Sequence, residues 1–118
     1  MPGGRRIAGV RRYRVTFRPA AERDLFRLYE YIAKQGSTER AAAFVGRIEE
    51  ACLSLRISPE RGTRREDIRR GLRVVGFEHR VAIVFQVGRT EVVIVRILYA
   101  GQDYERALRR RATPSKGN

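Results

Sequence analysis

YRVTFRPAAERDLFRLYEYIA, residues 13–33, changes from a strand pattern to a helix pattern at a single proline. Tyr13, Val15 and Phe17 alternate with polar residues, which is typical of a half-buried strand. Pro19 ends that strand and can open a helix, since the first helical N–H has no intrahelical partner in any case. The residues that follow carry one apolar face at spacings of three and four. This face holds Ala21, Leu25, Leu28, Tyr29, Ile32 and Ala33. The stretch therefore predicts a strand that leads directly into an amphipathic helix.

A second amphipathic helix follows after a very short joint. Gly36 is a good helix stop, and Ser37 or Thr38 can cap the next helix. The apolar face of this second helix holds Ala41, Phe44, Ile48, Ala51, Cys52 and Leu55. Because the joint is so short, we expect the two helices to be antiparallel neighbours, an αα-hairpin.

The second half of the chain predicts strands. An irregular connection at 58–62 and a highly charged segment at 63–70, expected to be a solvated loop, come first. Strands are expected at 71–75, 81–87 and 92–99, with a turn at 88–90. The segment 81–87 is apolar on both faces, as expected for a central strand. Residues 103–108 predict a short C-terminal helix.

This order of elements predicts the α+β class with two layers. An N-terminal strand and an antiparallel αα-hairpin would pack on a mostly antiparallel sheet of about three or four strands, because each apolar face needs another to cover it. We expect residues 1–12 to be a flexible basic leader, residues 13–108 the folded domain, and residues 109–118 a basic disordered tail.

Composition excludes several classes of protein. The 118 residues suit one domain, and a single cysteine excludes an intramolecular disulfide framework. One cysteine with one histidine also excludes the usual structural zinc sites, so we predict no metal. No apolar run approaches the roughly 18 residues of a membrane span, and the N-terminus lacks the apolar region of a secretory signal. We therefore expect a cytoplasmic protein without membrane contact.

The net charge of +13 is carried mainly by the two ends of the sequence. Residues 1–18 contain six arginines and residues 106–118 contain five cations, and neither stretch contains an acid. Subtracting these 11 from the 26 basic residues leaves 15 against 13 acidic residues in 19–105. Almost all cations are arginines, which bind carboxylates and phosphates alike. The charge therefore leaves acidic proteins and nucleic acid open as partners, including the plain role of a basic adaptor that binds nucleic acid through its ends.

Residues that could carry chemistry are few. No glycine-rich phosphate loop follows a strand, so no nucleotide cofactor is predicted. Cys52 lies in the apolar face of the second helix, which favours a buried, inert thiol. The constellation that could act lies on or beside the predicted strands and consists of Arg73, His79, Arg80, Arg96 and Tyr99, with Glu78 adjacent. Cleaving RNA needs a base, an acid and cations around the phosphate. The alternative is that these are polar residues at strand ends on a solvated face.

The ordered blocks resemble the RelE/ParE toxin superfamily over about residues 13–108. The stretch from Pro19 to Ala33 resembles the opening of ParE-type toxins, and Ser58-Pro59-Glu60-Arg61-Gly62 resembles the family's PxxG block. Gly71-Leu72-Arg73 and Ile94-Val95-Arg96-Ile97-Leu98 resemble its GLR and IxRVLH blocks. Ala82 and Gln102 stand where RelE-type nucleases carry arginines, Tyr99 replaces the histidine of RVLH, and Tyr104 is nearest to their C-terminal tyrosine. The resemblance therefore favours the ParE-type branch.

The resemblance implies the toxin of a type II toxin–antitoxin system. A ParE-type toxin would inhibit DNA gyrase by binding, without catalysis or a cofactor, and a ParD-like antitoxin would neutralise it in a hetero-oligomer. Target-binding candidates are Arg73, His79, Arg80, Arg96 and Tyr99, and antitoxin-binding candidates are Phe26, Tyr31 and Arg47. The alternative is a RelE-like, ribosome-dependent mRNA endonuclease that would use Arg80, Arg96 and Tyr99.

Overall fold

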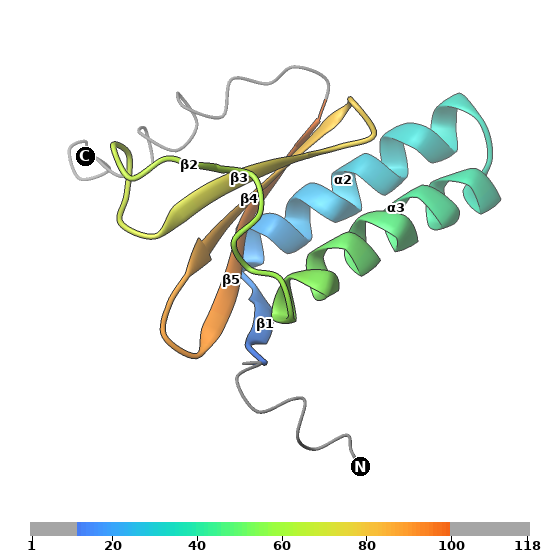
Figure 1. Cartoon of the computed structure of the whole chain (residues 1–118). Coiled ribbons are helices and arrows are strands. Elements are labelled where there is room, and N and C mark those ends of the chain that lie inside the picture. Colours follow the sequence, from blue (N-terminus) through green and yellow to red (C-terminus); the bar gives the residue numbers. More distant parts are fainter. Residues whose placement is uncertain (1–11, 100–118) are drawn as a thin grey trace, which may run out of the picture.

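The computed structural model describes residues 12–99, in which a helical hairpin covers one face of a five-stranded sheet (Figure 1). The elements are β1 (Arg14–Phe17), α2 (Pro19–Gln35), α3 (Thr38–Leu53), the short 3₁₀ helix η1 (Ser54–Arg56), β2 (Thr63–Arg64), β3 (Leu72–Phe77), β4 (Val81–Val87) and β5 (Glu91–Tyr99). The strand order is β1-β5-β4-β3-β2. This arrangement confirms the two-layer α+β prediction.

The helix ends lie where the local sequence places them. Pro19 is in the first turn of α2, and the N–H of Gly36 closes that helix by donating to the carbonyl of Ile32 at 2.9 Å. The hydroxyl of Ser37 caps α3 by accepting the N–H of Arg40 at 3.1 Å. Such a cap satisfies one of the N–H groups left free at a helix start, so the hairpin needs almost no loop.

The main core lies between the hairpin and the sheet. The hairpin residues Leu25, Phe44 and Ile48 share this core with Phe85 of β4 and Ile94 of β5, and all five side chains are buried. A smaller cluster of Leu72, Val84, Val95 and Leu98 lies apart from it, with Ile68 packed against it. The segment 81–87 is therefore the central strand that its composition predicts, because β4 contributes to both clusters.

Strand β5 pairs with both β1 and β4 along its first part and with β4 alone along its second part. β1 pairs with β5 in parallel, from Arg14 opposite Glu91 to Phe17 opposite Ile94. The antiparallel pairing of β5 with β4 shifts by one residue at the same point, since Phe85 lies opposite Ile94 but Val84 lies opposite Arg96. Val95 is thus an extra residue, a β-bulge. Beyond the bulge, β5 continues to Tyr99 without β1.

Two glycines have a backbone that other residues adopt only with strain. Gly62 and Gly71 have φ angles of 74° and 76°. A side chain at Gly62 would also collide with the carbonyl of Val74, and one at Gly71 would approach the carbonyl of Val87 to 2.8 Å. These contacts explain physically why glycine stands in the PxxG and GLR blocks.

One predicted segment differs in the structure. Residues 63–70 were expected to form a loop, but Thr63 and Arg64 form the edge strand β2, and Ile68 packs on the smaller cluster. The side chains of β2 are exposed, so its charged sequence gives no apolar alternation even though its backbone pairs with β3. This strand brings the sheet to five strands instead of three or four.

Several predictions concern residues outside the described range. Outside residues 12–99 lie the expected C-terminal helix at 103–108, the basic tail, Gln102 and Tyr104. The expected leader, residues 1–12, lies outside that range except for Arg12. In the described part of the chain, neither helix has the length and apolarity that crossing a membrane requires.

Candidate functional site

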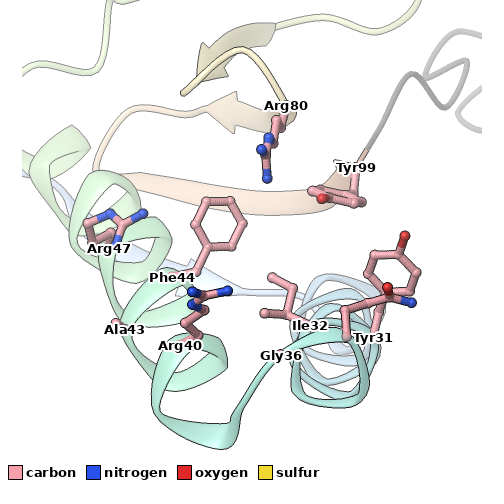
Figure 2. A pocket seen from close by; sticks show the side chains of 10 residues that line it. Tyr31, Ile32, Gly36, Arg40, Ala43, Phe44, Arg47, Arg80 and Tyr99 are labelled. Carbon is pink, nitrogen blue, oxygen red and sulfur yellow. The ribbon is translucent and has the colours of Figure 1, made fainter.

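A pocket of about 410 Å³ lies between the hairpin, at the end where its helices are joined, and the turn that connects β3 to β4 (Figure 2). Four separate elements supply its walls. The residues that line it are Tyr31, Ile32, Gln35, Gly36, Arg40, Ala43, Phe44, Arg47, Arg80 and Tyr99. A pocket walled by elements this far apart in sequence depends on the packing of the hairpin against the sheet.

Aromatic rings form one side of the pocket. The ring of Tyr99 lies 5.8 Å from that of Tyr31 and 6.4 Å from that of Phe44, measured between centroids. Phe44 in turn packs at 6.1 Å against Phe77, the last residue of β3. Tilted and edge-to-face contacts of this kind are favourable arrangements for aromatic rings. The cluster joins both helices to the ends of β3 and β5.

Three arginines line the same pocket. Arg40 and Arg47 come from α3, and Arg80 extends towards the pocket from the β3–β4 turn, across from the two helical residues (Figure 2). The guanidinium of Arg47 lies 5.3 Å from the centre of the Phe44 ring, which is a cation–π contact. Among the described residues that line the pocket, none is acidic. The pocket therefore favours an anionic group next to an apolar or aromatic one.

Glu78 is an acidic residue bonded to Arg47, one of the three arginines that line the pocket. Its carboxylate accepts two hydrogen bonds from Arg47, at 2.9 Å from Nε and 3.0 Å from Nη2. These bonds lower the pKa of Glu78 below its ordinary value and raise the pKa of Arg47. The pair links α3 to the β3–β4 turn.

The β3–β4 turn has an unusual backbone. Glu78 and His79 have φ angles of 50° and 59°, and the N–H of Arg80 donates to the carbonyl of Phe77 at 3.2 Å. Two central residues with positive φ define the tight hairpin turn that normally carries Asn-Gly. Here neither central residue is glycine.

Arg96 lies next to the pocket and is held by Asp24. Its Nε and Nη2 atoms donate to the two carboxylate oxygens of Asp24 at 2.7 Å and 2.9 Å. The same carboxylate accepts the backbone N–H of Ile97 at 2.8 Å. The hydrogen bonds to Asp24 raise the pKa of Arg96. The Asp24 carboxylate thus contacts β5 beyond Ile94, the last residue of β5 that pairs with β1.

The predicted site residues divide into two groups. Arg80 and Tyr99 from the target-binding set line the pocket together with Tyr31 and Arg47 from the antitoxin-binding set. Arg96 lines a smaller adjacent hollow that also includes Tyr31 and Tyr99.

The remaining candidates lie away from the pocket lining. His79 is exposed in the turn, and Arg73 donates to the carbonyl of Arg61 at 2.9 Å. Phe26 is 62% exposed on α2 and is absent from the pocket lining. The target-binding set is therefore only partly brought together.

Sequence reasoning missed Arg40 as a site residue and assigned Phe44 only to the core. A signal was present, because Arg40, Phe44 and Arg47 recur at spacings of four and three and so share a helix face. Nothing in the local sequence indicates that this face meets Arg80 and Tyr99.

The single cysteine is not part of the site. Cys52 is fully buried in the main core, and burial raises the pKa of its thiol to about 12. A thiol with this environment is inert, as its place in the apolar face of α3 predicts. Within residues 12–99, no group of three histidine, cysteine or acidic side chains is placed to hold a metal ion.

Among the solved structures similar to this chain are two from toxin–antitoxin systems. A protein of the chromosomal ParDE toxin–antitoxin system of P. aeruginosa matches with a TM-score of 0.65 and 24% identity, covering 75% of this chain and 96% of that one. A chain of the RelBE2 toxin–antitoxin complex of Mycobacterium tuberculosis matches with a TM-score of 0.52 and 26% identity, covering 78% of this chain and 95% of that one. Curated proteins gave no match.

The family comparison agrees with both the fold and the ordered sequence blocks. The model that describes the ParE toxin of the type II toxin–antitoxin system parDE matches residues 15–104, which include both helices and all the strands from Val15 onwards. The chain therefore belongs to the ParE toxin family of type II toxin–antitoxin systems.

Proposed function

We infer that this toxin inhibits DNA gyrase by binding to it, and that a ParD-like antitoxin neutralises it. The observation that carries this proposal is the pocket between the hairpin and the β3–β4 turn. It combines three arginines with three aromatic rings, and its described lining contains no carboxylate or imidazole that could act as a general base. A surface that combines arginines with aromatic rings is well suited to binding a protein, because these residue types are enriched at protein interfaces.

Charge complementarity supports an acidic protein partner. Arg40, Arg47 and Arg80 present guanidinium groups at one pocket, and arginine binds carboxylates through paired hydrogen bonds. The similar chains from P. aeruginosa and M. tuberculosis come from toxin–antitoxin systems. An acidic, amphipathic antitoxin segment would fit this surface, placing its apolar residues on the rings and its acids on the arginines. We expect the complex to be a hetero-oligomer in the cytoplasm.

Gyrase inhibition is tested with the purified protein and relaxed plasmid. We expect the protein to reduce supercoiling by gyrase and to raise the level of DNA cleavage complexes. Arg80→Ala should weaken this effect about tenfold, because it removes a charged group at the pocket. Arg89→Ala is the matched control, since Arg89 is an exposed arginine in the β4–β5 turn and is absent from the pocket lining. Unchanged supercoiling and cleavage with the wild-type protein would refute the gyrase assignment.

Antitoxin binding is tested by co-expression with the product of the adjacent reading frame. We expect the toxin to be recovered poorly alone and as a complex when the two are expressed together. Tyr31→Ala and Arg47→Ala should weaken the complex, because both side chains line the pocket. Phe26→Ala tests whether the antitoxin also covers the exposed ring on α2. An adjacent product that never co-purifies with the wild-type chain would count against the pairing.

The second candidate function is a ribosome-dependent mRNA endonuclease. We consider it because this chain is also similar to a chain of the RelBE2 complex. It would need Arg80, Arg96 and Tyr99 to act together. Two of these residues share the pocket, whereas the guanidinium of Arg96 is held by Asp24. Primer extension on translated mRNA separates the two functions. Discrete cuts that disappear in Arg96→Ala would favour the nuclease, and the gyrase proposal predicts no cuts.

A further inference from the structure

A second hollow, of about 540 Å³, lies where α3 passes into η1 and the connection to β2. We call it the α3–η1 hollow, and its lining includes Glu50, Leu53, Ser54, Arg56, Ile57 and Arg61. The side chains of Leu53 and Ile57 are 43% and 47% exposed. They are two of the four large apolar side chains that are exposed in the described part of the chain. Two uncovered aliphatic groups in one hollow indicate a surface that binds a partner.

The arginines of this hollow are available to an external acid. Arg56 and Arg61 line it, against the single carboxylate of Glu50 in the described lining. The Nη1 atom of Arg56 donates to the carbonyl of Leu53 at 3.0 Å. Within residues 12–99, neither arginine forms an ion pair with a carboxylate, whereas Arg47 and Arg96 each have one. Free guanidinium groups next to aliphatic side chains favour a partner that is both acidic and apolar.

Two further arginines add positive charge beside the hollow. The Nε atom of Arg73 donates to the carbonyl of Arg61 at 2.9 Å, and Arg73 lies directly opposite Arg64 in the pairing of β2 with β3. Like charges placed directly opposite each other on neighbouring strands are destabilising. No described carboxylate pairs with either residue. An acidic partner would relieve this repulsion.

The α3–η1 hollow continues the face of α3 that borders the pocket. Arg40, Ala43 and Arg47 line the pocket, and Glu50 and Ser54 line the hollow. These five residues recur at spacings of three and four, so they share one side of the helix. The face is about 20 Å long, and a partner helix of about 14 residues would span it. One amphipathic segment can therefore reach both hollows.

Charge and apolarity argue against three other occupants. Residues 1–11 begin close by, since the N–H of Tyr13 donates to the carbonyl of Arg56 at 2.8 Å, but they contain three arginines and no acid. A second copy of a chain with net charge +13 would be repelled. Nucleic acid would match the arginines with its phosphates but would leave Leu53 and Ile57 without an apolar partner.

Between the two proposed protein partners, the need for neutralisation favours the antitoxin. Gyrase and antitoxin are both proposed to use the pocket, so an antitoxin that suppresses toxicity must bind more tightly than gyrase does. Specificity is a difference of affinities, and a contact that only one partner makes supplies that difference. A second contact made by the same segment also raises the overall affinity well above that of the first contact alone.

We propose that the α3–η1 hollow is a second binding site for the antitoxin, filled by the same acidic amphipathic helix that covers the pocket. The inference rests on the proposed function, because it takes the antitoxin as the partner and the pocket as the shared site. Aliphatic side chains of the antitoxin would contact Leu53 and Ile57, and its carboxylates would contact Arg56 and Arg61.

The experiment measures antitoxin affinity and toxicity in the same variants. The probe is the purified product of the adjacent reading frame, titrated calorimetrically into the full chain, and growth inhibition is measured without that product. Arg61→Glu should raise the Kd about tenfold or more, because it reverses a charge in the hollow. Leu53→Ala/Ile57→Ala should raise it about tenfold by removing the apolar contact. Both variants should inhibit growth as the wild type does, because neither changes the pocket lining.

Two variants serve as controls. Arg89→Glu makes the same charge reversal at an exposed arginine outside both linings and should leave the Kd within about twofold of wild type. Arg61→Lys keeps the charge and should retain most of the affinity. Preserved growth inhibition shows that a variant is folded, so a weaker complex then reports on the hollow itself.

Several results would overturn the proposal. Unchanged antitoxin affinity in both test variants would do so while leaving the antitoxin pairing intact. Loss of growth inhibition in both variants would assign the hollow to the target instead, and weaker binding to duplex DNA alone would assign it to nucleic acid. A wild-type chain that does not bind the adjacent product would refute both this inference and the pairing. Failure of the gyrase assay alone would leave the inference standing, because the titration contains no gyrase.

Discussion

Asp24 accepts three hydrogen bonds, two from the guanidinium of Arg96 and one from the backbone N–H of Ile97. Its side chain is only 8% exposed and that of Arg96 is 16% exposed. The helix α2 thereby supplies a hydrogen-bond acceptor to β5 beyond the bulge at Val95, where β1 no longer pairs. A residue that sequence reasoning considered as a site for an external target, Arg96, thus has its main contact within the fold.

Replacing Asp24 should therefore destabilise the protein. We expect Asp24→Ala to lower the free energy of unfolding by about 2–3 kcal/mol, because it leaves a partly buried guanidinium and a backbone N–H without their acceptor. Chemical denaturation measures the change. Glu30→Ala, at an exposed position of α2, should cost less than about 0.5 kcal/mol. Equal stability of the two variants would show that the pair is not a structural link.

At the scale of elements, the β3–β4 turn joins the sheet to the hairpin. Arg47 of α3 and Glu78 of the turn are 31 residues apart in sequence and meet in a paired hydrogen bond. The turn also carries Arg80 to the pocket, while the aromatic contact of Phe44 with Phe77 anchors the end of β3 on α3. This short turn consequently supplies one wall of the pocket, through Arg80.

Relieving strain in the turn should stabilise the protein. His79 has a φ of 59° at the second central position, where glycine is preferred. We expect His79→Gly to raise the free energy of unfolding by about 0.5–1 kcal/mol, which corresponds to a rise of several degrees in Tm. His79→Ala keeps the steric cost and should give no such gain. A lower Tm in His79→Gly would mean that the imidazole makes a stabilising contact.

The ion pair between the turn and α3 should make stability depend on acid pH. The pKa of Glu78 is lowered in the folded protein by hydrogen bonds from Arg47, whereas an unfolded glutamate titrates near about 4.3. The pair therefore stabilises the fold above that pH and loses its effect as the pH falls through the lowered pKa. Because both side chains are exposed to solvent, we expect Glu78→Gln to lower the Tm only slightly at pH 7, and this difference should shrink as the pH falls. A difference in Tm that does not shrink with falling pH would assign the effect to something other than charge.

At the scale of the whole molecule, the excess positive charge and the pocket come from different parts of the sequence. The excess of arginine lies mainly at the ends of the sequence, whereas the pocket is built from four elements of the described domain. We expect general adhesion to polyanions to depend on the first feature, and the proposed binding of a protein partner to depend on the second.

These two properties should respond to different substitutions. Arg5→Gln/Arg6→Gln/Arg11→Gln should lower the salt concentration at which the protein leaves heparin, because fewer cations contact the polyanion. Growth inhibition on expression should persist. Arg80→Ala should do the reverse: it should reduce growth inhibition and change the elution from heparin little. Loss of growth inhibition in the triple variant alone would favour the basic-adaptor role.

The sequence by itself determined four of the five strands, all except β2, together with the two helices and the short joint between them. Pro19, Gly36 and Ser37 act within one turn of chain, and the apolar periods of α2, α3 and β4 are local patterns, so these elements were predictable. Only the tertiary structure decided the parallel pairing of β1 with β5 and the contacts that unite distant residues. Asp24 and Arg96 are 72 residues apart, and no local pattern links them. The pocket belongs to this second kind, because its chemistry arises where the packed core brings the hairpin, the β3–β4 turn and the end of β5 together.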